Sequence, residues 1–488
     1  MIFGTALRFY KLTASSIWHD EGYTMWLLKY NPIEIVARTA RDVHPPGYYL
    51  IAKTWISVLG NSAFAIRTLS VLFSLGIIYF VYKIVEKLFT ERAAFWASMF
   101  VALSPFMVRF AQEARMYGVV AFFTTLGTYF LVRWVQEKNN KILIPYALSM
   151  LVAVYTQYYA FFIIMVHWII IASITPDIFS FKWKDSIKKK LNIFNPYWWL
   201  AGAAIIIGYL PWFPIAYKQV TRVSGSYWIK PEWINANTIP NNITQFLIYT
   251  HLDGSGYEML GWKLLYWVLV VVLIGSGFVL LIKKDIRSKV SLFLLYGYLP
   301  MILVFILSKV RTPVYQDRYF PFSGVAILAL WGIAISTLKN NYLRITLAAL
   351  AIVVLVAGNF KMHADTNHQM KALSEAVKKE MRPGDIVLSG ELYTFLDGSY
   401  YFGDKNIRFI SNPVDGYGES SLFYDQQDSY VVSSDEAIAL GLNHRVFIIG
   451  KTGNKKYFSN CLINAKSSRV IFEENNDDAL KAVLYSNE

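Results

Sequence analysis

Two adjacent carboxylates, Asp20 and Glu21, follow a short apolar run at the N-terminus. Acidic residues are scarce in the apolar part of the chain around them. A carboxylate can remove a proton from a hydroxyl or an amine, so the pair is a candidate for general base catalysis. The dipeptide alone favours a plainer interpretation, in which both acids lie in a solvated loop.

A second motif starts at Asp42 and continues as Val-His-Pro-Pro-Gly-Tyr-Tyr to Tyr49. The two prolines fix backbone dihedral angles, and the tyrosines, Tyr48 among them, suit a membrane interface. His44 can meet an anionic headgroup as a cation or as a hydrogen-bond donor. By itself, the motif favours a rigid turn before an interfacial helix.

Two further polar motifs combine arginine with tyrosine. One contains Glu113, Arg115 and Tyr117, and the other ends in Arg318 and Tyr319. Arginine binds phosphate through two parallel hydrogen bonds, and tyrosine suits a hydrogen bond at the bilayer surface. The structural alternatives are an ion pair between Glu113 and Arg115, and basic residues that only anchor a helix at anionic lipids.

The composition identifies the setting of these motifs. Of the 488 residues, 55% are hydrophobic, 17% aromatic and only 16% charged, which predicts a membrane protein. The net charge is +14, and the basic excess lies wholly before Gly358, whereas the remainder is slightly acidic. A lone cysteine, Cys461, excludes an intrachain disulfide framework and a cysteine-based metal site.

Apolar runs predict ten membrane-spanning helices before Gly358. An N-terminal run, Met1 to Leu7, is too short to span a bilayer, and we expect a preceding helix to be missing or shortened. If this run ends a first helix, the total is eleven. The predicted spans are Phe64 to Tyr82, Ala93 to Val108, Val119 to Val135, Ile142 to Tyr155, Tyr159 to Ile174, Tyr197 to Tyr217, Leu264 to Ile282, Val290 to Leu307, Phe320 to Leu338 and Leu343 to Gly358.

After Gly358 the pattern predicts a small soluble α/β domain over residues 359–488. A helix is expected over Gln369 to Met381 and short buried strands over Ile386 to Leu388 and Arg445 to Gly450. The chain is thus expected to have a transmembrane module, 1–358, followed by this domain.

Lysine and arginine predict the orientation, because basic loops are retained on the cytoplasmic side. The loops after the odd-numbered spans, including 182–190, are the basic ones. The opposite, extracytoplasmic face then holds the candidate catalytic loops 8–63, 109–118, 218–262 and 308–319, together with the C-terminal domain. Loop 218–262 is expected to form an acceptor-binding lid or an interfacial helix. Its Asn242-Ile243-Thr244 triplet matches a glycosylation pattern that is common by chance.

All four polar motifs are therefore predicted on one face of the membrane, and this co-location suggests a site. Paired carboxylates beside cations and aromatic residues suit transfer from a lipid-linked phosphate. A carboxylate would deprotonate an acceptor hydroxyl or amine, while arginine, histidine and tyrosine would stabilise the departing phosphate.

As a set, the motifs resemble the GT-C superfamily of polyprenyl-phosphate-dependent glycosyltransferases. The resemblance covers about residues 1–360 and is strongest to glycosyltransferase family 39, the dolichyl-phosphate-mannose protein mannosyltransferase-like proteins, and to bacterial aminoarabinose transferases of lipid A. It implies a mostly α polytopic membrane protein of GT-C type with about 10–11 transmembrane helices. It also implies that Asp20 is the catalytic base and that Glu21 supports it. In addition, it implies a donor-phosphate site and a set of residues that line the cavity. The phosphate site would comprise His44, Arg115, Arg318 and Tyr319, and the lining Asp42, Tyr48, Glu113 and Tyr117.

The resemblance also implies partners and a location. We expect a polyprenyl-phosphate sugar donor, an acceptor that is a lipid, a glycan or a protein, surrounding membrane lipids and no nucleic acid. The protein would be a multi-pass protein of the cell (inner) membrane, with the active site and the C-terminal domain on the extracytoplasmic side. No cofactor is required by the motifs, and the resemblance leaves a divalent metal open, although the seven histidines have no metal-binding spacing. One difference is Tyr23, which stands where a close relative has arginine.

Two other functions fit part of these observations. A transporter or flippase of a lipid-linked saccharide would use the same cations to bind phosphate, but the sequence has no internal repeat of the kind that transporters show. A third interpretation makes the membrane part a scaffold that displays the C-terminal domain.

Overall fold

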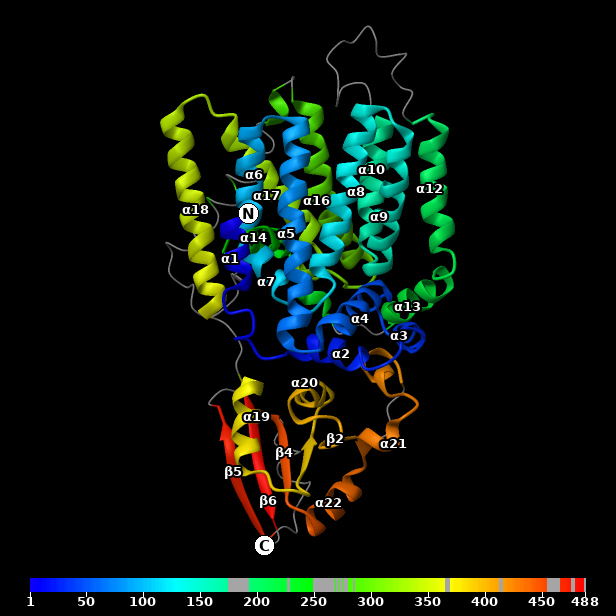
Figure 1. Cartoon of the computed structure of the whole chain (residues 1–488), viewed down its shortest axis with the longest axis vertical. Helices are drawn as coiled ribbons and strands as arrows, with labels where there is room; N and C mark the ends of the chain where they lie inside the picture. The colour runs from blue at the N-terminus through cyan, green and yellow to red at the C-terminus, as the bar shows by residue number, and fades with distance from the viewer. Residues whose placement is uncertain are drawn as a thin grey trace. The chain divides into compact units, whose positions relative to one another are not determined.

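The computed structural model describes residues 1–173, 193–225, 229–248, 280–283, 286–364, 369–411, 416–453, 466–474 and 479–486, with single positions at 268, 271 and 275. The contacts divide the chain into two compact units (Figure 1). We call Met1–Tyr10 with Arg67–Asp365 the helical unit, and Lys11–Ile66 with Thr366–Glu488 the α/β unit. The first predicted extracytoplasmic loop is therefore grouped with the C-terminal domain.

The helical unit is a bundle of apolar helices. They are α1 (Ile2–Phe9), α5 (Ala63–Leu88), α6 (Glu91–Leu103), α7 (Pro105–Ala111), α8 (Tyr117–Glu137), η1 (Asn140–Ile142), α9 (Leu143–Thr156), α10 (Ala160–Ser173), α12 (Pro196–Tyr209), α13 (Phe213–Gly225), η4 (Pro231–Trp233), α14 (Thr238–Ile248), α16 (Arg287–Val310), η5 (Asp317–Tyr319), α17 (Pro321–Ser336) and α18 (Asn341–Ala364).

This bundle confirms a multi-pass membrane protein. Among the described residues, four helices are long and apolar enough to cross a membrane, or up to six if each of two bent pairs is one span. Three shorter apolar helices, 140–156, 160–172 and 321–336, match further predicted spans. The predicted span at 264–282 lies almost wholly outside the described residues.

Two predicted spans are each divided into two helices at a proline. Helices α6 and α7 meet at 60°, where Ser104 has an extended conformation before Pro105. Helices α12 and α13 meet at 71° around Pro211. Proline has no N–H to donate to the preceding turn of a helix, so each span bends where the sequence places one. The predicted unbroken helices at 93–108 and 197–217 were wrong in this respect.

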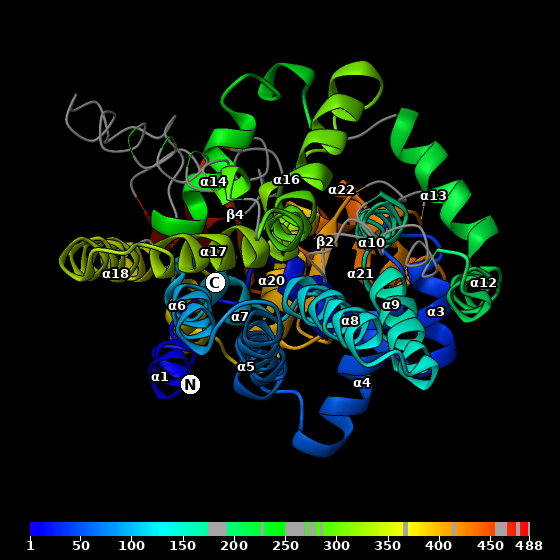
Figure 2. The same ribbon diagram turned by 90° about the horizontal axis from the view of Figure 1, so that it is seen from above.

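Small residues set the closest helix contacts in the unit. A Cβ on Gly332 of α17 would lie 2.2 Å from the Ala97 nitrogen of α6, so only glycine allows these backbones to approach. Figure 2 shows α6 and α17 side by side. Such contacts are typical of helix packing in membranes, where small residues permit close van der Waals contact.

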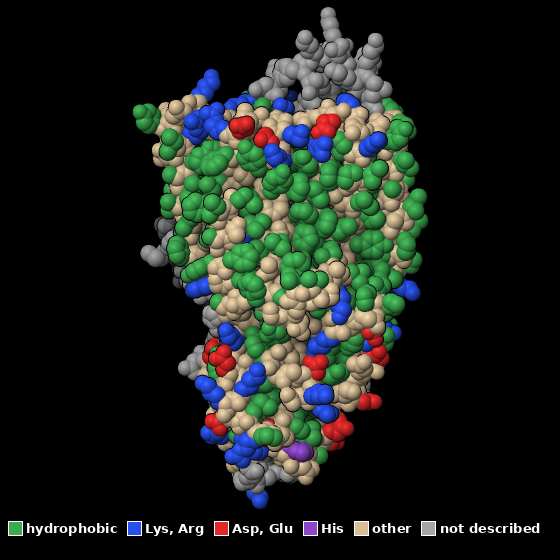
Figure 3. All heavy atoms as spheres, viewed as in Figure 1, with side chains coloured by type: hydrophobic (Ala, Val, Ile, Leu, Met, Phe, Trp, Pro, Cys, Tyr) green, Lys and Arg blue, Asp and Glu red, His purple; other side chains and the backbone are tan. Residues whose placement is uncertain are grey.

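The outer surface of the helical unit is largely apolar. Figure 3 shows a broad hydrophobic belt, with lysine and arginine gathered along the edge where α18 begins and where α5 joins α6. Exposed large side chains on α12 and α18 include Ile206, Ile207, Leu350 and Val353. Lipid contact explains such exposure, because apolar surface of this extent is rare on soluble monomers.

The α/β unit is built on a six-stranded mixed sheet in the order β3-β2-β1-β4-β6-β5. The pairs β1–β2, β1–β4 and β2–β3 are parallel, and β6 is antiparallel to both β4 and β5. The strands are β1 (Ile386–Ser389), β2 (Ile407–Ile410), β3 (Val431–Val432), β4 (Val446–Lys451), β5 (Ser467–Glu473) and β6 (Leu480–Ser486). The predicted C-terminal α/β region is confirmed.

Helices complete this unit from two distant parts of the chain. The N-terminal segment supplies α2 (His19–Leu27), α3 (Pro32–Thr39) and α4 (Gly47–Leu59). The C-terminal segment supplies α19 (Gln369–Glu380), α20 (Leu392–Phe402), η6 (Gly418–Leu422), α21 (Gln427–Tyr430) and α22 (Ser434–Asn443). Helix α3 starts with Pro32 and a capping box between Asn31 and Glu34, a sequence signature of a helix N-terminus.

Candidate active site

The bend between α6 and α7 leads to the first group of predicted site residues. The chain turns back after α7 through Gln112 to Met116 and enters α8 at Tyr117. Glu113 forms an ion pair with Arg109, with 2.8 Å between the Glu113 Oε1 and Arg109 Nε atoms. Glu113 and Arg115 are both buried, which is costly for charged side chains in a membrane protein and makes them candidates for a functional site.

Polar side chains hold the bend and the turn after it. Arg8 is fully buried and donates to the carbonyls of Gly4 and Ala102 at 3.0 and 2.8 Å and to Ser74 Oγ at 2.8 Å. Asn359 of α18 donates to the Leu103 carbonyl at 2.7 Å. The last carbonyls of α6, which the proline leaves without backbone donors, therefore receive side-chain donors.

A second group of site residues lies in the segment between α16 and α17. Gln245 of α14 donates to Asp317 Oδ2 at 2.5 Å, and Tyr315 donates its hydroxyl proton to Asn242 Oδ1 at 3.0 Å. Burial and, after it, the Asp317 charge raise the pKa of Tyr315 above its ordinary range, so the hydroxyl stays a donor. These bonds fix the backbone beside Arg318.

The two groups of the helical unit meet at their tyrosines. The Tyr117 and Tyr319 ring centroids are 6.3 Å apart, and Tyr319 also packs edge-on against Tyr159 at 5.5 Å. Tyr117 and Tyr319 are both buried. The structure thus brings together a residue from the 109–118 loop and one from the 308–319 loop, as the prediction of a shared site requires.

The α/β unit holds the remaining predicted residues. Asp20 and Glu21 lie in the first turn of α2, where the N-terminal end of a helix dipole favours negative charge. Glu21 is fully buried, whereas the Asp20 side chain is 12% exposed. Its Oδ1 atom lies 3.7 Å from Nε2 of His19. The plainer interpretation of this pair, a solvated loop, is wrong, because both acids are buried in a helix.

Asp42, His44 and Tyr48 lie between α3 and the first turn of α4. Asp42 and Tyr48 are buried and His44 is partly buried. A chain of tyrosine rings links this segment to α2: Tyr48 packs on Tyr49 at 5.3 Å, and Tyr49 on Tyr23 at 5.9 Å. A single cavity that joins this group to Glu113, Arg115 and Arg318 remains a prediction.

Sequence reasoning missed the residues that support these groups. Arg109 and Asp317 lie within the two arginine–tyrosine motifs, but no role was predicted for them. Asn242 was considered only as part of a glycosylation pattern. In the structure Asn242 is fully buried and bonded to Tyr315, so its role is structural. A run of polar residues in a short helix is the sequence signal that could have identified such supports. In the structure this run is buried: Asn241, Asn242, Thr244 and Gln245.

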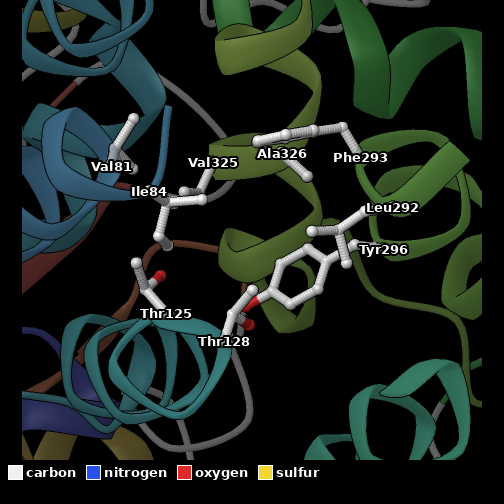
Figure 4. A pocket seen from close by; sticks show the side chains of 9 residues that line it. All are labelled: Val81, Ile84, Thr125, Thr128, Leu292, Phe293, Tyr296, Val325 and Ala326. Atoms are coloured by element: carbon white, nitrogen blue, oxygen red, sulfur yellow. The ribbon is translucent and has the colours of Figure 1, made fainter. Parts of the chain in front are cut away.

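The helical unit also contains an apolar pocket, whose lining includes none of the predicted site residues. Nine residues of α5, α8, α16 and α17 line it, and Figure 4 shows Thr125, Thr128 and Tyr296 as its polar members. Val81 and Ile84 lie toward the end of α5 that is farther from residue 67. This lining suits a hydrocarbon chain and lacks the charged groups that bind phosphate. Within the described part of the chain, no cluster of three His, Cys, Asp or Glu side chains is arranged to hold a metal ion.

Comparison with known proteins identifies the class of enzyme. Residues 43–213 match the family described as dolichyl-phosphate-mannose-protein mannosyltransferase. The chain is a membrane glycosyltransferase, as its motifs predict. No curated protein sequence matches it significantly.

The fold is similar to solved GT-C glycosyltransferases over nearly the whole chain. ArnT from Cupriavidus metallidurans bound to undecaprenyl phosphate has a TM-score of 0.60 and 12% identity, covering 99% of this chain and 97% of that one. The apo form of that protein gives the same TM-score and identity. The oligosaccharyltransferase of Archaeoglobus fulgidus tethered with an acceptor peptide has a TM-score of 0.51 and 12% identity, covering 94% and 69% of the two chains. The predicted GT-C fold is confirmed.

Proposed function

We propose that this glycosyltransferase moves a sugar from a polyprenyl-phosphate donor to an acceptor on the extracytoplasmic face of the membrane. Asp20 acts as the general base, with Glu21 in support. Arg115, Arg318, Tyr319 and His44 bind the donor phosphate.

The donor class is supported by a relative and by side-chain chemistry. A structure with the same fold along almost its entire length binds undecaprenyl phosphate. In this chain, Arg115 is buried, and Arg318 lies beside the buried Tyr319. Guanidinium groups bind phosphate oxygens by charge-assisted, often bidentate hydrogen bonds, which strengthen as the surroundings exclude water.

The reaction needs one proton acceptor and several hydrogen-bond donors. Asp20 takes the proton of the acceptor hydroxyl or amine as its heteroatom attacks the anomeric carbon. The bond from that carbon to the phosphate oxygen breaks, and the polyprenyl phosphate leaves with the electron pair. Arginine, histidine and tyrosine stabilise the charge on the departing phosphate. Attack opposite the leaving group inverts the anomeric configuration, as the resemblance implies.

Asp20 is better suited than Glu21 to contact the acceptor. Both lie in the first turn of α2, but only the Asp20 side chain keeps some exposure, whereas Glu21 is fully buried. A base must lie within hydrogen-bond reach of the proton that it removes. This difference in exposure at the start of α2 is the observation that carries the proposal.

The test is transfer of radiolabelled sugar from a panel of polyprenyl-phosphate sugars by the purified full chain, with water and envelope extract as acceptors. We expect label to leave one donor lipid, and that lipid would name the sugar. If the chain binds these lipids yet releases label from none of them, the transferase proposal fails and the transporter interpretation gains weight.

A further inference from the structure

We propose that the C-terminal part of the α/β unit, residues 369–486, positions helix α2 and through it the carboxylate of Asp20. The inference rests on the proposed function for the role of Asp20, and it gives the C-terminal domain a part in catalysis. The argument concerns contacts inside one unit.

Helix α2 is too short to define its own position. It has nine residues, including Gly22 and the β-branched Thr24. Isolated helices shorter than about 12 residues are marginal in water, so tertiary packing must hold α2 in place. Every residue from Asp20 to Leu28 is buried, which shows how completely the packing surrounds it.

The closest support comes from α20. A Cβ on Gly22 would lie 2.8 Å from the carbonyl oxygen of Leu396 and 3.1 Å from the backbone nitrogen of Asp397. These are backbone atoms of a helix, which cannot move aside as a flexible side chain would. The residue directly after Glu21 is therefore in contact with α20, and glycine is required at this point.

An aromatic cluster fixes the other end of α2. The Trp26 ring lies 5.1 Å from Phe395, 4.9 Å from Tyr430 and 6.2 Å from Phe423, measured between centroids. Trp26 is almost fully buried. Aromatic pairs at these distances add stabilisation beyond the area they bury, so the cluster anchors α2 to α20, to Phe423 directly after η6, and to α21.

A buried arginine holds the next helix to the same segment. Arg38 of α3 donates to both carboxylate oxygens of Asp425, at 3.0 and 3.1 Å, and to the Leu422 carbonyl at 2.8 Å. Its guanidinium also lies 3.6 Å from the Tyr30 ring centroid. Tyr30 in turn donates to the Leu422 carbonyl at 2.6 Å. Two side chains that follow α2 thus bind the same backbone carbonyl.

The contacts also continue before α2 and after α4. The Ile17 amide donates to the Tyr401 hydroxyl at 2.9 Å, and the Lys371 amide donates to Ser16 Oγ at 3.1 Å. The Ala63 amide donates to the Tyr400 hydroxyl at 3.0 Å. The C-terminal segment therefore contacts both ends of the N-terminal loop, and it also contacts α2, where the candidate base lies.

Two variants of the full chain test the inference. Gly22→Ala forces α2 away from α20, and Arg38→Met removes the arginine that binds Asp425 and Leu422. Arg469→Met is the matched control, because Arg469 lies on β5 with a side chain 60% exposed and pairs only with an exposed glutamate among its described ion pairs. Exposed pairs contribute little to stability.

The first readout is hydrogen exchange of the α2 amides. Because Arg38→Met removes the hydrogen bonds that a buried guanidinium donates to Asp425 and to the Leu422 carbonyl, we expect exchange over His19–Leu27 to accelerate on the order of tenfold or more. Gly22→Ala should accelerate the same amides, whereas Arg469→Met should leave them unchanged. Unchanged α2 exchange in both Gly22→Ala and Arg38→Met would overturn the inference.

The second readout separates positioning from the proposed function. In a wild type that transfers sugar, Gly22→Ala should lower kcat while binding of undecaprenyl phosphate stays the same. Faster α2 exchange with an unchanged kcat would overturn the positioning role and leave the transferase function intact. If the wild type transfers no sugar, the proposed function fails, and the exchange data still test whether the C-terminal segment holds α2.

Discussion

Two partnered acidic residues, the buried Glu113 and the half-buried Asp317, support the candidate site in the helical unit. Glu113 pairs with Arg109 one helical turn earlier, and Asp317 receives a hydrogen bond from Gln245. These contacts hold the loops in which Arg115 and Arg318 lie. The sequence motifs contain the candidate residues, whose roles stay predictions. The motifs do not reveal Arg109 and Gln245 as supports, since such partners depend on the bend after Leu103 and on a contact 72 residues away in the chain.

Replacing Arg318 should specifically weaken binding of the lipid-phosphate donor. Each hydrogen bond to a charged group contributes about 1.5–3 kcal/mol, so we expect Arg318→Ala to raise the Kd for undecaprenyl phosphate by about 10–100-fold. Arg318→Lys should recover part of this loss, because lysine keeps the charge but not the two-point geometry. Arg311→Ala, an exposed arginine in the same segment, is the control. Equal effects of the Arg318 and Arg311 substitutions in titrations with the lipid would contradict a phosphate contact.

At the scale of elements, the important feature is the break between α6 and α7. The sequence predicted one span at 93–108, and Pro105 explains why it is divided. The side chains that bind the freed carbonyls are Arg8 and Asn359. They come from opposite ends of the helical unit's sequence, which no local pattern reveals.

Arg8 should therefore matter for the stability of the bend. Arg8→Met leaves the Ala102 carbonyl without its side-chain donor, and a buried unsatisfied group costs about 1–3 kcal/mol. We expect a lower Tm for the full chain in detergent. Arg92→Met changes an exposed arginine near the start of α6 and should leave Tm unchanged. A wild-type Tm in Arg8→Met would show that the bend does not depend on this cap.

At the scale of the whole molecule, hydropathy and charge predicted the membrane bundle and the C-terminal α/β region well. Apolar runs identify spans because backbone polar groups must be satisfied within each helix. The grouping of Lys11–Ile66 with the C-terminal segment was not predicted, because contacts such as that between Arg38 and Leu422 join residues 384 positions apart.

The predicted orientation can be measured directly. In a Cys461→Ser background, Asp435→Cys would place a thiol at an exposed position of α22, and Arg92→Cys would place one in the first turn of α6, in the basic segment between α5 and α6. We expect a membrane-impermeant maleimide added to intact cells to label the first and not the second, because basic loops stay cytoplasmic. Labelling of position 92 alone would contradict the predicted orientation and indicate the opposite one.

The central claim is that Asp20 is the base for sugar transfer, and single-turnover transfer from the productive lipid donor tests it most directly. A positioned base contributes about 10²–10⁴-fold, so Asp20→Asn should slow the transfer step by that factor while donor binding and hydrogen exchange stay at wild-type levels. Asp435→Asn, the same change at an exposed position, should transfer at the wild-type rate. An Asp20→Asn chain that transfers sugar as fast as the wild type would contradict the account.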